Sequence, residues 1–295
     1  MAAKGVFGQA KNWILSRLFY SLALPRRRAG EYAPRVNSPL EGKSLVVIGG
    51  TTGIGLSAAR AFVEAGARVI VVGRNPESCA VAQERFEGAG LAIPGDACDP
   101  QTAPRAIDEA IRAHGGFHGL YHVAGGSGRK MGDGPVHELT DEGWHATLDL
   151  NLTSLMMSNR AAVRQFLAQG GGGSILNIGS VLGFSPSSLH FATHAYAAAK
   201  SAVLGFSKAI AACYAPHDIR VNVLAPALVE TPMATRAISS VEIRSFIQTK
   251  QPLDGGRIGQ PGDLDAAAVY FMSDGARFVT GQVLAVDGGW CVSEG

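Results

Sequence analysis

A glycine-rich turn close to residue 50 constrains the fold of this chain more than any other feature of its sequence. The turn, Gly49-Gly50-Thr51-Thr52-Gly53-Ile54-Gly55, follows the β-branched run Ser44 to Ile48 and precedes a helical pattern from Leu56 to Ala65. In a strand–turn–helix unit, such glycines allow a tight turn and a close approach of the backbone to a pyrophosphate, which the N–H groups at the helix start attract. Glycine also serves turns that bind nothing. The place of this turn between a strand and a helix favours a dinucleotide-binding turn.

The rest of the chain alternates short β-branched runs with helical stretches, as in an α/β protein with a parallel sheet. After the first strand, further strands are predicted at residues 68–72, 91–93, 119–123, 174–178, 220–224 and 283–286. Helices are predicted at residues 56–65, 103–113, 141–169 and 196–214, the third ended by the glycine run 170–173. This order predicts a doubly wound parallel β-sheet flanked by helices, in a single domain over residues 41–295. Ligands of such a sheet bind beyond the carboxyl ends of its strands.

Composition excludes several classes of function. Lysine and arginine number 26 against 24 acidic residues, so no strongly basic surface for nucleic acid is expected. The four cysteines show neither a C-x-x-C pair nor a cysteine–histidine cluster, which argues against a metal site and a disulfide framework. We therefore expect reduced thiols in a cytoplasmic protein.

Residues 1–40 form a basic, amphipathic N-terminal segment that differs from the rest of the chain. Its apolar stretch, Trp13 to Leu24, contains Arg17 and is shorter than the ~20 apolar residues that a membrane span requires. A signal peptide is not expected, because Pro25 and three arginines follow where a small-residue cleavage site should be. A helical arm that packs or contacts another subunit is favoured over one that lies on a membrane surface.

The glycine spacing G-x-x-x-G-x-G, read together with Tyr196-Ala-Ala-Ala-Lys200, resembles the short-chain dehydrogenase/reductase family in its classical form. The resemblance covers roughly residues 40–290. Further matching signals are Asn151 within residues 149–153, Ser180 after Asn177-Ile178-Gly179, residues 226–231, and the ending 280–289. The resemblance implies a Rossmann fold, an NAD(P)-dependent oxidoreductase, and a homotetramer or homodimer with the ending at a subunit interface.

Tyr196 and Lys200 are four residues apart on a predicted helix, so their side chains share one face. The resemblance assigns Tyr196 as the acid/base, Lys200 as the residue that tunes it and holds the nicotinamide ribose, and Ser180 as a hydrogen-bond donor to the carbonyl oxygen. It assigns Asn151 to a proton path through water. A phenol has a pKa of ~10, and we expect the ammonium and an oxidised nicotinamide to lower that of Tyr196.

The segment between Ser180 and Tyr196 is about three residues longer than the family pattern. Ser185, Ser187 or Ser188 could therefore take the role of Ser180, although only Ser180 stands at a strand end. His190 and His194 lie in the same segment; they could contact substrate, but ordinary surface or gate residues are favoured.

Arg74 follows the second strand, where NAD-binding members carry an acidic residue that accepts the ribose hydroxyls. A guanidinium there suits a 2′-phosphate, so NADP(H) is favoured, with NAD(H) as the alternative. Ile48 and His122 replace the family's usual Thr and Asn, and we expect the second change to weaken a brace between strands. The resemblance gives the full set of cofactor-contacting residues as Gly49, Thr51, Thr52, Gly53, Ile54, Gly55, Arg74, Asn75, Asp96, Ala97, Ala124, Gly125, Tyr196, Lys200, Pro226, Val229 and Thr231.

Residues 228–255 are expected to cover the substrate, and their apolar content predicts a small-molecule alcohol or ketone with a hydrophobic body. Arg129 or Lys130 could meet an anionic substrate group, but a solvated loop is favoured. The favoured function is carbonyl reduction; epimerisation or dehydration through transient oxidation, and nicotinamide binding by a non-enzymatic regulator, are alternatives. Enoyl reduction is disfavoured because relatives with that activity space Tyr and Lys more widely.

Overall fold

Residues 38–86 and 88–294 are described by a computed structural model. Most of the N-terminal arm predicted for residues 1–40 thus lies outside the described residues. From Ser38 onward the chain forms one compact unit. Within the described part of the chain, no helix is long and apolar enough to span a bilayer.

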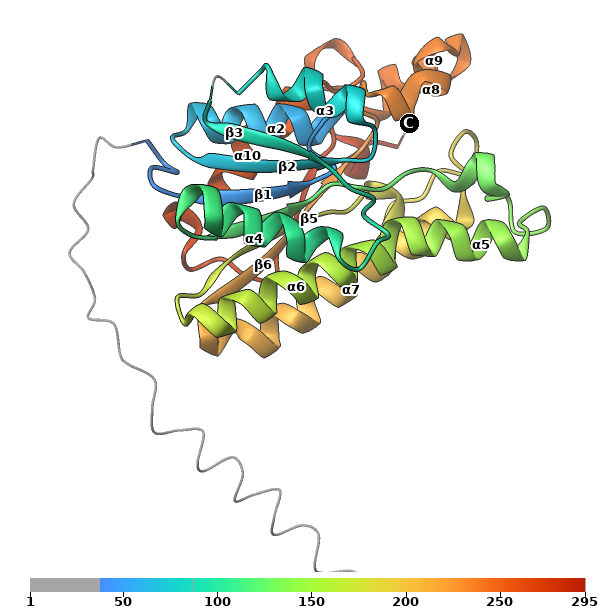
Figure 1. Cartoon of the computed structure of the whole chain (residues 1–295). Coiled ribbons are helices and arrows are strands. Elements are labelled where there is room, and N and C mark those ends of the chain that lie inside the picture. The colour runs from blue at the N-terminus through green and yellow to red at the C-terminus, as the bar shows by residue number, and fades with distance from the viewer. Residues whose placement is uncertain (1–37, 87, 295) are drawn as a thin grey trace, which may run out of the picture. The chain divides into compact units, whose positions relative to one another are not determined.

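Seven parallel strands form one sheet in the order β3-β2-β1-β4-β5-β6-β7 (Figure 1). Each lies within two residues of its predicted bounds. The order reverses between β1 and β4, which makes their carboxyl ends the expected ligand site. The strands are β1 (Ser44–Ile48), β2 (Arg68–Gly73), β3 (Gly90–Pro94), β4 (Gly119–His122), β5 (Gly173–Ile178), β6 (Ile219–Pro226) and β7 (Val283–Val286).

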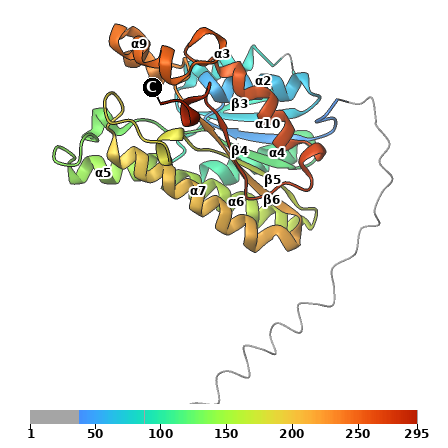
Figure 2. The ribbon, with the colours of Figure 1, turned by 180° about the vertical axis from the view of Figure 1, so that it is seen from behind.

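Helices cover both faces of the sheet, with α2 and α10 on one and α4, α6 and α7 on the other (Figures 1 and 2). Each face buries its own apolar core, one around Phe62 and Phe271, the other around the stacked rings of Phe117 and Phe166. The helices are α2 (Gly53–Glu64), α3 (Pro76–Gln83), α4 (Thr102–His114), α5 (Asp141–Leu148), α6 (Ser154–Gln169), α7 (His194–Tyr214), α8 (Thr235–Ser239), α9 (Val241–Lys250) and α10 (Asp265–Met272).

The structure corrects three expectations about the helices. Helix α2 begins at Gly53, three residues before the predicted start, so the glycine turn includes the first helical turn. The single helix predicted for residues 141–169 is divided into α5 and α6 by a π-helical segment, Asp149–Thr153. Helices α3, α8, α9 and α10 were not predicted; the short, polar sequence of α3 buries only Cys79 and Ala82. Its start was readable as an Asn-Pro pair, since Asn75 accepts hydrogen bonds from two N–H groups of the first turn.

Candidate active site

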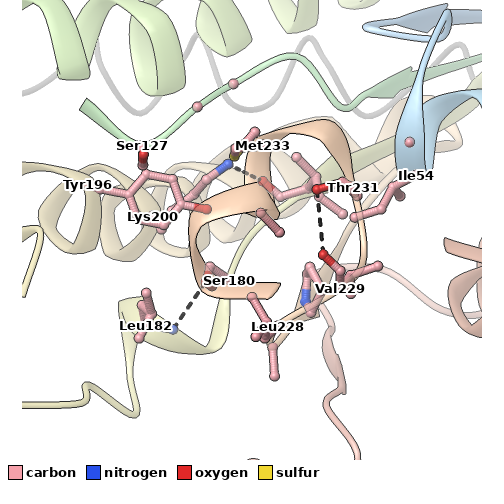
Figure 3. A pocket seen from close by; sticks show the side chains of 18 of the residues that line it. Ile54, Ser127, Ser180, Leu182, Tyr196, Lys200, Leu228, Val229, Thr231 and Met233 are labelled. Atoms are coloured by element: carbon pink, nitrogen blue, oxygen red, sulfur yellow. Dashed lines mark hydrogen bonds between the residues drawn. The ribbon is translucent and has the colours of Figure 1, made fainter. Parts of the chain in front are cut away.

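A cavity of about 790 Å³ opens at the carboxyl ends of the strands, between the glycine turn, the loop after β4, and residues 228–237. Figure 3 shows Tyr196, Lys200 and Ser180 at this cavity, with Val229 and Thr231 nearby. The cavity brings together twelve of the predicted site residues: Gly49, Thr52, Gly53, Ile54, Ala124, Gly125, Ser180, Tyr196, Lys200, Pro226, Val229 and Thr231. The remaining seven do not line it.

The glycine turn fits a dinucleotide. Gly49 has a φ of +86°, and a Cβ there would lie 2.6 Å from the backbone nitrogen of Ala124. A Cβ on Gly55 would lie 2.1 Å from the carbonyl oxygen of Gly49. The chain is therefore packed backbone to backbone at this point, and the unpaired N–H groups of the first turn of α2 lie where an anionic pyrophosphate can approach.

Six of the seven predicted residues outside the cavity lie in the glycine turn or just after β2 and β3. Thr51 packs its side chain over Gly73, where a Cβ would lie 2.1 Å from the Thr51 hydroxyl oxygen. Gly55 is buried under the glycine turn. The carboxamide oxygen of Asn75 caps α3, and one carboxylate oxygen of Asp96 accepts a hydrogen bond from the Cys98 N–H. The remaining two are Arg74, which is exposed, and Ala97, which is half-buried.

Tyr196 and Lys200 project from one face of α7 as the four-residue spacing predicts. The Lys200 Nζ lies 5.6 Å from the centre of the Tyr196 ring and donates a hydrogen bond of 3.0 Å to the carbonyl oxygen of Ile178. Burial lowers the pKa of Lys200 to about 8. Burial also raises the pKa of Tyr196 to about 12, against a hydrogen bond with Ser180 that lowers it. Among the protein groups, desolvation of the phenolate dominates. The expected lowering of the Tyr196 pKa by Lys200 together with an oxidised nicotinamide stays a prediction.

Asp133 fixes the start of α7, and sequence reasoning missed it. This buried carboxylate accepts two hydrogen bonds of 3.0 Å, from the backbone N–H groups of Ala195 and Tyr196. A carboxylate at a helix N-terminus accepts hydrogen bonds from N–H groups that have no partner within the helix, and its negative charge interacts favourably with the positive end of the helix dipole. Asp133 lies 63 residues before Tyr196, and no local pattern connects the two.

Asn151 lies in the π-helical segment and is fully buried. Its Nδ2 donates to the carbonyl oxygens of Gly126 and Thr147, and its Oδ1 accepts from the Gly126 N–H. Both of its N–H donors are thus engaged, and the side chain ties α5 and α6 to the loop after β4. Asn151 positions the wall of the cavity without lining it.

His122 braces β4 from below the cavity. Its buried ring contacts the Ser158 hydroxyl at 2.7 Å and the Ser154 hydroxyl at 3.4 Å. Burial lowers the pKa of His122 to about 3, so the ring is neutral. These contacts join β4 to α6, so the expected weakening of a brace between strands stays a prediction.

The longer segment before Tyr196 packs into an aromatic cluster. The ring centre of Phe191 lies 5.7 Å from that of Trp290, and His190 packs on Phe246 of α9 at 5.2 Å. Trp290 donates a hydrogen bond to the Ser185 carbonyl oxygen. Among the four serines considered for the carbonyl contact, Ser180 is the one that lines this cavity. The extra residues thus build a wall and leave Ser180 in place.

Comparison with known proteins agrees with this geometry. The sequence model of a family described as Enoyl-(Acyl carrier protein) reductase matches residues 49–291. A 2,5-dichloro-2,5-cyclohexadiene-1,4-diol dehydrogenase from Sphingobium indicum is 32% identical over 254 residues, 86% of this chain and 98% of that protein. An NADP-dependent (R)-specific alcohol dehydrogenase from Lentilactobacillus kefiri is 33% identical over 255 residues, 85% of this chain and 97% of that protein.

Among solved structures, a short-chain type dehydrogenase/reductase from Mycobacterium ulcerans matches with a TM-score of 0.79 at 35% identity, covering 87% of this chain and 92% of that one. The chain belongs to the short-chain dehydrogenase/reductase family and is an NAD(P)-dependent oxidoreductase.

Proposed function

We propose that this protein is an NADP(H)-dependent carbonyl reductase that interconverts a secondary alcohol and a ketone or aldehyde, with Tyr196 as the acid/base. The observation that carries the proposal is the convergence of Tyr196, Ser180 and buried Lys200 on one cavity with the glycine turn. A tyrosine and a lysine four residues apart on an exposed helix face would stay in contact with water and would not show these pKa shifts.

Each side chain has a defined task in the direction of reduction. A bound nicotinamide would supply the hydride to the carbonyl carbon. The Tyr196 phenol donates its proton to the carbonyl oxygen, and the Ser180 hydroxyl donates a hydrogen bond to the same oxygen. Lys200, which keeps most of its charge at neutral pH with a pKa of about 8, favours the phenolate that proton transfer leaves behind.

The spacing of Tyr196 and Lys200 favours carbonyl over enoyl reduction. The description of the matching family model names an enoyl reductase, whereas the two relatives compared above are named as dehydrogenases of a diol and an alcohol. A four-residue spacing places the Tyr196 phenol and the Lys200 ammonium side by side on one helix face, where both can act on the oxygen of a substrate carbonyl.

Arg74 supports a preference for NADP(H). It is exposed at the end of β2, close enough to Cys98 after β3 for its charge to oppose the rise in that thiol's pKa. A planar guanidinium can pair with a 2′-phosphate through two N–H groups. We expect Arg74→Ala to weaken NADPH binding at least ten-fold and to leave NADH binding within two-fold. An unchanged ratio of the two dissociation constants would remove Arg74 from the account.

A panel of ketones, aldehydes and alcohols, followed through nicotinamide absorbance with NADP(H) and NAD(H), tests the proposed function. Wild-type protein should turn over at least one class of ketone or secondary alcohol, and Tyr196→Phe should reduce that turnover 100-fold or more, in the range of general acid–base catalysis. Nicotinamide binding without turnover on any member would instead favour a regulator that binds the nucleotide.

A further inference from the structure

Two arginine side chains from different parts of the chain meet at the cavity. Arg129, in the 3-10 helix Gly128–Met131 after β4, and Arg236, in α8, both line it. Each donates a hydrogen bond from Nη2 to the same acceptor, the carbonyl oxygen of His190, at 3.2 Å and 3.1 Å. Arg129 is half-buried and Arg236 is exposed.

The two guanidinium groups lack a matching negative charge. In residues 38–86 and 88–294, neither forms an ion pair with a carboxylate. Burial lowers the pKa of Arg129, and the charge of Arg236 lowers it further, against the opposing charge of Asp133. One neutral carbonyl oxygen cannot balance two cations, and each guanidinium has N–H donors left over. An anion between them would relieve the repulsion.

The pair lies on the Tyr196 side of the cavity. His190, their shared acceptor, is six residues before Tyr196, and Asp133, four residues after Arg129, holds the N–H of Tyr196 itself. Both arginines donate to His190, in the segment that leads into α7 and Tyr196. We therefore assign the arginine pair to the substrate.

Apolar side chains line the cavity next to the arginine pair. Leu182, Phe191 and Trp290 contribute to its wall, and the last two rings pack edge to face. A substrate that reaches from Tyr196 to the arginines would contact these rings with its hydrocarbon part.

We propose that the substrate is a ketone with an apolar body and a terminal anionic group, a carboxylate or a phosphate, bound between Arg129 and Arg236. This inference rests on the proposed carbonyl reduction. An arginine binds either anion through parallel N–H donors, so recognition of the two has the same chemistry. The anion would fix the distance of the carbonyl carbon from Tyr196 and would thereby select chain length.

A matched series of ketones tests the proposal. The probes are methyl-ketone carboxylates from 4-oxopentanoate to 9-oxodecanoate, their methyl esters, and phosphonates of the same chain lengths, each with NADPH. At the best length, wild-type kcat/KM should be 10- to 100-fold higher for an anion than for its ester. The ratio of carboxylate to phosphonate then identifies which anion the site prefers.

In the Arg129→Gln/Arg236→Gln double variant, kcat/KM for the anions should fall to the value for the esters, and kcat/KM for the esters should stay at the wild-type value. Because the esters need the same loop and the same Tyr196, an unfolded or displaced loop would reduce both and can be recognised. Arg244→Gln is the matched control, since Arg244 is an exposed arginine of the neighbouring helix α9 that does not line the cavity. It should behave as wild type.

Anions and esters reduced at equal rates by the wild type would overturn the inference and leave carbonyl reduction standing. If no ketone of any charge is reduced, the proposed function fails instead. Calorimetric titration of the carboxylates then still tests the anion site. Carboxylate binding that is lost in the double variant but kept in Arg244→Gln supports the site. Binding that the double variant keeps, or that the wild type lacks, refutes it.

Discussion

At the scale of single residues, the site is held together by polar groups removed from water. Lys200 carries a desolvation cost, because its ammonium is buried and donates to one backbone carbonyl oxygen. Its pKa in the folded chain, about 8, lies below its ordinary value of 10.5. The unfolded chain therefore binds this proton more tightly, and the charge destabilises the folded chain at neutral pH. The cost fades as the pH rises from about 8 to about 10.5.

Lys200→Met should accordingly raise the free energy of unfolding near pH 7 by roughly 1–3 kcal/mol, after allowing for the hydrogen bond lost at Ile178. The advantage should shrink between pH 8 and pH 10. Urea unfolding at several pH values measures it, with Lys208→Met, exposed on the same helix, as control. Parallel pH profiles for wild type and Lys200→Met would contradict the buried charge.

Asp133 is a positioning residue whose loss should affect both stability and catalysis. Asp133→Ala leaves the N–H groups of Ala195 and Tyr196 without acceptors, so we expect about 1–3 kcal/mol of destabilisation. The looser start of α7 should reduce kcat about ten-fold with little change in KM. Asp141→Ala, an exposed first-turn carboxylate on α5, provides the comparison. If the two variants have equal kcat, the cap does not position Tyr196.

At the scale of elements, the contact between α7 and the 3-10 helix Val181–Gly183 sets the distance from Ser180 to Tyr196. A Cβ on Gly183 would lie 2.8 Å from the Ser201 nitrogen and 2.9 Å from the Lys200 carbonyl carbon. Gly183→Ala should therefore push the two elements apart, lower stability by about 1–3 kcal/mol and reduce turnover. Gly205→Ala, in open space on the exposed side of α7, should instead add about 0.5–1 kcal/mol and leave turnover unchanged. Thermal unfolding and steady-state rates separate the two; equal effects would show that the contact is unimportant.

The sequence pattern predicted the strands. It did not predict the π-helical segment or α3, where side chains hydrogen-bond to backbone groups. All seven strands were predicted, although β4 contains no β-branched residue and β3 contains only Ile93. The π-helical segment was not predicted; within it, the Asn151 side chain donates to the Thr147 carbonyl oxygen. Helix α3 depends on its cap more than on an apolar face, so a periodicity criterion overlooks it.

At the scale of the whole molecule, β7 is one edge of the sheet, paired within the described residues with β6 alone. Phe278, just before it, is fully exposed, and Leu284 of β7 is 41% exposed. An edge with exposed apolar side chains is a candidate for contact between subunits, as the resemblance implies for the chain's ending. Light scattering should give a homotetramer or homodimer, and Phe278→Asp a smaller species. Val81→Asp, on exposed α3, should not change the mass; a monomeric wild type would refute the assembly.

The part of the site that consists of sequence motifs was predicted from the sequence. Tyr196, Lys200, Ser180 and the glycine turn meet at one cavity, because a parallel sheet brings its strand ends together whatever their separation in sequence. Asp133 and the pairing of Arg129 with Arg236 were not predictable, since they depend on loops whose contacts no local pattern records. Burial, which the sequence does not show, raises the pKa of Tyr196 more than the hydrogen bond with Ser180 lowers it.

The most direct test of Tyr196 as the acid/base is a single-turnover reduction with protein in excess over NADPH, followed by loss of nicotinamide absorbance in wild type and Tyr196→Phe. Removing the phenol oxygen leaves the ring and the buried Lys200 in place, and each protein is used well above its own measured dissociation constant for NADPH. The rate constant of the variant should be at least 100-fold lower. Equal rate constants at equal NADPH occupancy would contradict the role of Tyr196.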